Sequence, residues 1–213
     1  MEREQDKILL VEGTGDKGVF TELLKAWGIQ CPLIKDCGSV EDVFRMMRLC
    51  LTNSGQYKYV GVVVDADTHP EGRLHRFLQI AAKSGRYNIN GCMHLQSEGL
   101  VAEGLDVDAA RIGLWVMPDN RDHGMLEDFL AKMAATVSPE LLDEAESALV
   151  RVEKQGIQQY TPVHRPKAKM HTYLAWQKEP GAALPVAIMK HYLDASSDNA
   201  RPFISWINRL FGR

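Results

Sequence analysis

Acidic residues follow two of the most apolar stretches of the chain, in an arrangement that suits metal-ion chemistry. Glu12 ends the run "ILLVE", and Asp65 and Asp67 end the run "YVGVVVDAD". Residues two apart on an extended backbone point the same way, so we expect the two aspartates to share one side of a strand end. Converging carboxylates repel one another unless a hard cation lies between them. The three acids therefore predict a site for Mg2+ or Mn2+.

Two more acids come after the next apolar run. Asp119 follows "GLWVMP", and Glu127 lies in "GMLEDFL" near the start of a predicted helix. We predict both as metal ligands and Glu127 also as a catalytic residue. Two alternatives stay open: Asp119 as an ordinary turn residue, since Pro-Asp-Asn favours a turn, and Glu127 as an exposed helix residue.

The densest basic stretch of the chain is "VHRPKAKMH", residues 163–171. Nucleic acid needs cations beside its phosphates. We therefore predict that Arg165, Lys167 and Lys169 contact phosphate, with Lys169 also catalytic, and that Arg73 adds a further contact. The alternative is a solvated helix start without a ligand.

Three glycines, Gly13, Gly15 and Gly18, match the spacing G-x-G-x-x-G of dinucleotide-binding loops. Two neighbours oppose that function. Asp16 would place a negative charge against the pyrophosphate, and Glu12 occupies the strand end where ligand-handling groups gather. We interpret the glycines as a tight strand-to-helix turn beside Glu12.

The elements expected around these residues alternate between strand and helix. Apolar runs predict strands over 7–12, 29–35, 59–64 and 110–117, with short or edge strands at 88–95 and 100–103. Helical spacing or caps predict helices over 16–27, 39–51, 70–83, 125–135, 141–152, 167–177 and 201–210. This order is typical of an α/β, Rossmann-like, mostly parallel sheet flanked by helices. The carboxyl ends of such strands meet at one edge, which brings the acids together.

Composition sets the remaining bounds. We expect an α/β core over residues 1–135 and a helical C-terminal extension over 136–213, packed as one unit of 213 residues. A net charge of -3 excludes a globally basic nucleic-acid binder but not a local phosphate site. The four cysteines have no C-x-x-C spacing, which favours free thiols and a cytoplasmic location. The N-terminus does not read as a signal peptide, and no apolar stretch approaches membrane length, so no membrane partner is expected.

With Glu-Gly after one strand and Asp-x-Asp after a later one, residues 7–130 resemble the TOPRIM domain of primases, topoisomerases and OLD nucleases. The stretch "GLWVMPDNRDHGMLEDFL" is similar to small stand-alone bacterial TOPRIM-like proteins of the OLD-related kind. The resemblance implies a Mg2+-dependent phosphodiester site. Asp65 and Asp67 would bind metal, Glu12 would bind metal or relay a proton, Glu127 would complete the cluster, and a lysine, Lys169 or Lys167, would reach the scissile phosphate.

The sequence also departs from that pattern. Thr68, His69 and Pro70 follow the Asp-x-Asp motif where OLD-like proteins often carry another acid. The predicted function is metal-dependent hydrolysis of DNA or RNA, and a need for a separately encoded partner protein stays open. The alternatives are a non-catalytic TOPRIM-like module that binds nucleic acid or protein, and an aspartate-based phosphotransferase. The latter usually has threonine at the position of His69.

Overall fold

The computed structural model describes residues 6–52, 56–89 and 94–212. Its sheet has the strand order β2-β1-β3-β5-β4. The strands are β1 (Lys7–Val11), β2 (Leu33–Asp36), β3 (Tyr59–Asp65), β4 (Leu100–Ala102) and β5 (Arg111–Met117). All pairs are parallel except β4 with β5, which is antiparallel. The predicted α/β class with a mostly parallel sheet is thus confirmed.

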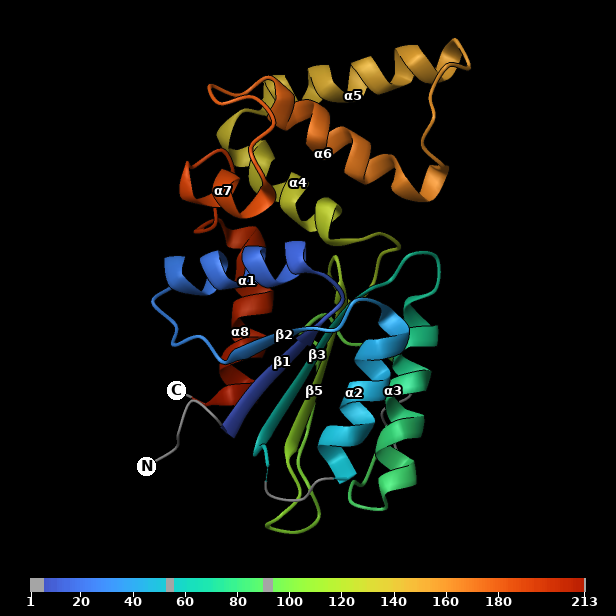
Figure 1. Cartoon of the computed structure of the whole chain (residues 1–213), viewed down its shortest axis with the longest axis vertical. Helices are drawn as coiled ribbons and strands as arrows, with labels where there is room; N and C mark the ends of the chain where they lie inside the picture. Colours follow the sequence, from blue (N-terminus) through green and yellow to red (C-terminus); the bar gives the residue numbers. More distant parts are fainter. Residues whose placement is uncertain (1–5, 53–55, 90–93, 213) are drawn as a thin grey trace.

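Helices cover both faces of the sheet, as Figure 1 shows. On one face lie α2 (Val40–Thr52) and α3 (Pro70–Ser84), and on the other α1 (Thr14–Ala26) and α8 (Arg201–Phe211). Side chains alternate between the faces: Leu9 and Val11 join the cluster with α1, whereas Ile8 and Leu10 join the cluster with α2. Burial on both faces explains why these strands are apolar throughout.

A second layer of helices lies beyond the carboxyl ends of the parallel strands (Figure 1). It contains α4 (Leu126–Val137), α5 (Pro139–Lys154), α6 (Arg165–Ala175) and α7 (Leu184–Met189). The chain then returns to the sheet as α8, which packs on the same face as α1. A segment far beyond residue 135, the predicted end of the α/β core, therefore completes that core. Within the described residues, every helix is too short or too polar to cross a lipid bilayer.

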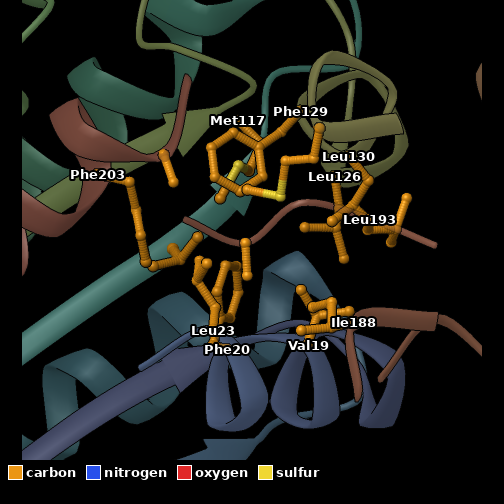
Figure 2. Close-up of a cluster of buried hydrophobic side chains, with 14 of the residues drawn as sticks. Val19, Phe20, Leu23, Met117, Leu126, Phe129, Leu130, Ile188, Leu193 and Phe203 are labelled. Carbon is orange, nitrogen blue, oxygen red and sulfur yellow. The ribbon is translucent and has the colours of Figure 1, made fainter. Parts of the chain in front are cut away.

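Phe203 of α8 joins the two parts of the chain. The centroid of its ring lies 5.1 Å from the ring centroid of Phe20 in α1, 5.4 Å from that of Trp115 in β5 and 6.0 Å from that of Phe129 in α4. Figure 2 shows this region, where side chains from α1, β5, α4 and α8 meet. The aromatic cluster fixes the second helical layer relative to the sheet.

Two elements differ from the sequence prediction, and the short or edge strand predicted at 100–103 is confirmed. Asn88, Ile89, His94 and Leu95 are not in a strand, and residues 90–93 lie outside the described part of the chain. The predicted strand at 100–103 is the short antiparallel β4. The sequence analysis missed α7, whose six residues are too few for a helical repeat to be recognised.

The glycine-rich segment is helix rather than turn from Thr14 onward, and its third glycine has a packing function. A Cβ on Gly18 would lie 2.4 Å from Cγ of Pro185 in α7. Gly18→Ala should therefore lower the free energy of unfolding by about 1–2 kcal/mol, because overpacking outweighs the gain in helix propensity.

Urea unfolding of both glycine variants tests this prediction. Gly15 lies in the same helix, and a Cβ added there would have no neighbouring atom within 4 Å, so Gly15→Ala is the matched control and should be neutral or stabilising. The double variant Gly18→Ala, Pro185→Gly should lose less free energy of unfolding than the sum of the losses in the two single variants. A Gly18→Ala protein as stable as wild type would contradict the packing argument.

Candidate active site

A cavity of about 470 Å³ opens at the carboxyl edge of the sheet, between the strand ends and α6 and α7. Its walls include residues 13–15 at the start of α1, Gly38, Leu126 and residues 183–185 before and within α7. Six titratable side chains line it: Glu12, Asp16, Asp65, Glu127, Lys167 and His171. The predicted convergence of Glu12, Asp65 and Glu127 is therefore present.

Glu12 follows β1 directly and is held by the neighbouring strand. The backbone N–H of Asp65 donates to Glu12 Oε1 at 2.8 Å. Burial raises the pKa of Glu12 above its usual value, and the negative charge of Asp16 raises it further, against the lowering effect of that N–H bond. A buried carboxylate fixed on one oxygen is suited to accept a proton or to bind a cation.

Asp65, the last residue of β3, is the most strongly perturbed acid of the cavity. Its Oδ1 accepts the N–H of Leu126, 2.9 Å away, at the start of α4. Burial together with the charges of Glu12, Asp16 and Glu127 raises the pKa of Asp65 to about 8. Negative charge is therefore costly here without a cation.

Two acids come from helix starts. Asp16 accepts the N–H of Gly13 at 2.6 Å, which caps α1, and burial raises its pKa despite that bond. Glu127, in the first turn of α4, is only 5% exposed and lies 3.8 Å from the ammonium group of Lys167. The sequence analysis missed Asp16 as a cavity residue, although its position four residues after Glu12 was a usable signal.

Asp67 and Asp119 lie elsewhere, for different reasons. The backbone leaves the extended region at Asp67, where φ is 51°, so the two-residue alternation that paired it with Asp65 does not apply. Arg73 donates to Asp67 Oδ2 at 2.7 Å. Asp119 accepts from Lys132 at 2.7 Å and from the N–H of Asp122, as in the turn alternative. Neither lines the cavity in the described structure.

The residues of the basic stretch lie on different faces of α6. Lys167 and His171, four residues apart on α6, line the cavity. Lys169 instead lies 3.1 Å from Glu146 of α5. Arg165 donates to Glu146 and also to Glu153 at 2.7 Å, and the hydrogen bonds and charges of Arg165 and Lys169 lower the pKa of Glu146 to about 2. Two of the predicted phosphate contacts thus join α6 to α5.

The donor chemistry of the cavity fits a hard divalent cation. Carboxylate oxygens from Glu12, Asp65 and Glu127, with Asp16 beside them, are the ligands that Mg2+ and Mn2+ take. Among the described residues, no three acidic, histidine or cysteine side chains are already drawn together closely enough to hold an ion. Side-chain rotation would therefore accompany binding.

Comparison with known proteins identifies a family. The model of a family described as a protein of unknown function, DUF3226, matches residues 6–212. No curated protein and no solved structure matches the chain significantly.

Proposed function

The chain belongs to the DUF3226 family, and we propose that it hydrolyses phosphodiester bonds of nucleic acid with Mg2+ or Mn2+, on a TOPRIM-like core. The observation that carries this proposal is the convergence of four buried or half-buried carboxylates with Lys167 and His171 in one cavity. The free thiols of Cys37 and Cys50 support a cytoplasmic location for this activity.

Each side chain has a part in the proposed reaction. Asp65 and Glu127 would hold the cation together with Glu12, and Asp16 lies beside them. Bound Mg2+ supplies stabilisation of the charge that builds on the phosphate group. Glu12, with its raised pKa, accepts a proton from the attacking water, and Lys167 contacts a phosphate oxygen.

Metal binding tests the first step of this proposal. Calorimetric titration of Mg2+ and Mn2+ should show binding to wild type that falls at least about tenfold in Glu12→Gln. Glu41→Gln is the matched control, because Glu41 is exposed and pairs with Arg76 outside the cavity. Equal binding by wild type and Glu12→Gln would contradict the assignment of Glu12.

The affinity for Mg2+ should rise with pH up to about pH 8. Burial and mutual repulsion raise the pKa of Asp65 to about 8 and also raise that of Asp16. A cation must displace the protons that these groups carry at lower pH. Calorimetry in two buffers with different ionisation enthalpies measures the proton release, which should be substantial at about pH 6 and absent above about pH 9. An affinity for Mg2+ that does not change with pH would contradict the prediction that the cation displaces protons from these acids.

One observation favours the non-catalytic alternative, a module that binds nucleic acid without cutting it. In the described part of the chain the acids are not preassembled around a common point. Cleavage assays separate the two functions: metal-dependent cleavage that Asp65→Ala abolishes supports the enzyme, whereas metal-independent binding without cleavage supports the module.

A further inference from the structure

The cations near the site are too few to follow a long phosphate backbone. Four basic residues have phosphate contacts predicted from the sequence, and all four are hydrogen-bonded or ion-paired to carboxylates in the described structure: Arg73, Arg165 and Lys169 outside the cavity, and Lys167 with Glu127 inside it. Among the described residues that line the cavity, the positive charge comes from Lys167. Proteins that bind polymeric nucleic acid commonly make about six to ten phosphate contacts.

The carboxylates of the cavity also disfavour a polymeric substrate. We call these four side chains the acidic wall: Glu12, Asp16, Asp65 and Glu127. Duplex DNA carries one negative charge per roughly 1.7 Å of its axis, so a backbone that crosses the cavity mouth would bring several phosphates to four carboxylates. A divalent cation offsets two of those charges. With the charge of Lys167 added, the four carboxylates keep a net negative charge, so each phosphate adds repulsion and the site favours the substrate with the fewest phosphates, one phosphodiester group between the cation site and Lys167.

The size of the cavity agrees with the charge balance. Its volume of about 470 Å³ falls in the range of small-molecule pockets, about 300–1,000 Å³. The segment at residues 183–185 and the face of α6 with Lys167 and His171 wall it opposite Glu12 and Asp65. The double helix is stiff over about 150 base pairs, so its backbone does not bend sharply enough to enter such a space.

We infer that the substrate is a short single-stranded phosphodiester, a dinucleotide or the end of a strand, held through one phosphate group between the acidic wall and the Lys167–His171 face of α6. This inference rests on the proposed hydrolysis. In that reaction the bond from water oxygen to phosphorus forms, the bond from phosphorus to the leaving sugar oxygen breaks, Glu12 takes one water proton, and the leaving oxygen takes a proton from solvent.

The experiment compares a dinucleotide, a long single strand and a long duplex without free ends at equal concentration of phosphodiester bonds. We expect kcat/KM for the dinucleotide to exceed that for the duplex at least about tenfold. Raising the salt from about 50 to 200 mM should lower kcat/KM for the dinucleotide only about 3- to 10-fold, as one or two phosphate contacts require, whereas six to ten contacts would give about 10³–10⁵.

Two variants locate the contact. Lys167→Gln should lower kcat/KM for the dinucleotide about tenfold and remove most of the remaining salt dependence. Arg151→Gln removes a charge from the outer helix α5, where Arg151 pairs with Glu144 outside the cavity, and should change neither quantity.

The outcomes separate the two proposals. A closed duplex cut as fast as the dinucleotide, with a steep salt dependence, would overturn the small-substrate inference and leave the hydrolytic function standing. No hydrolysis of any of the three substrates with Mg2+ or Mn2+ would overturn the proposed function, and this inference with it.

Discussion

Asp65→Asn should abolish the proposed metal-dependent hydrolysis and at the same time make the metal-free protein more stable at about pH 8. The loss of activity should reach about 10²–10³-fold, since an amide holds a cation less well and several kcal/mol of transition-state stabilisation depend on that cation. Asparagine can still accept the N–H of Leu126 that now bonds to Asp65 Oδ1, so the start of α4 should keep its position.

The gain in stability follows from proton linkage. The pKa of Asp65 is raised from its usual value of 3.8 to about 8 by burial and by Glu12, Asp16 and Glu127. Between these two values the native state binds more protons than the unfolded state, so stability falls as the pH rises through this window. One pKa unit corresponds to about 1.4 kcal/mol, and the coupled cluster shares the effect, so we expect a gain of about 2 kcal/mol.

Urea unfolding in the presence of a chelator, from about pH 5 to pH 9, measures this effect. The difference between Asp65→Asn and wild type should grow with pH. Asp119→Asn is the matched control, in which we expect a change in stability of the opposite sign. Burial raises the pKa of Asp119, but the Lys132 bond and backbone N–H groups outweigh it and hold that pKa low, so the substitution should destabilise. An Asp65→Asn protein less stable than wild type at high pH would contradict the repulsion argument.

Phe203→Ala should cost about 3–5 kcal/mol, the largest loss of stability that we expect from one substitution. The ring of Phe203 is fully buried and contacts the rings of Phe20, Trp115, Phe129 and Trp206. Its removal would leave a cavity at the point where α8, the sheet and α4 meet, and both the transfer free energy and the ring contacts would be lost.

Equilibrium unfolding followed by both circular dichroism and tryptophan fluorescence measures this change. Leu49→Ala on α2 is a suitable control, because Leu49 is half exposed and its truncation should cost less than about 1 kcal/mol. A cost below about 1.5 kcal/mol for Phe203→Ala would mean that the second helical layer is not fixed through this cluster.

The sequence alone determined the sheet and the two acids at its edge. The run Val62, Val63 and Val64 predicts a buried strand, because a strand covered on both faces must be apolar at every position, and these residues do divide between the two faces. Glu12 and Asp65 then follow at the ends of neighbouring parallel strands, and parallel strands bring their carboxyl ends to one edge whatever the later helices do. These inferences needed only the local pattern and the general rule of the architecture.

The partners of the charged side chains were decided by the tertiary structure. Lys167 and Lys169 are indistinguishable in a basic stretch, but α6 turns Lys167 toward the cavity and Lys169 toward Glu146 of α5. Asp67 was predicted beside Asp65. The positive φ angle of Asp67 instead turns its side chain away, and its carboxylate accepts a hydrogen bond from Arg73.

The physical reason is the range of the interactions. The apolar pattern that predicts a buried strand is local in the sequence, whereas an ion pair depends on how two helices pack, and the Arg165–Glu146 pair joins residues 19 positions apart. The packing of α5, α6 and α7 over the sheet edge therefore decides which charges face the cavity and which hold the fold together.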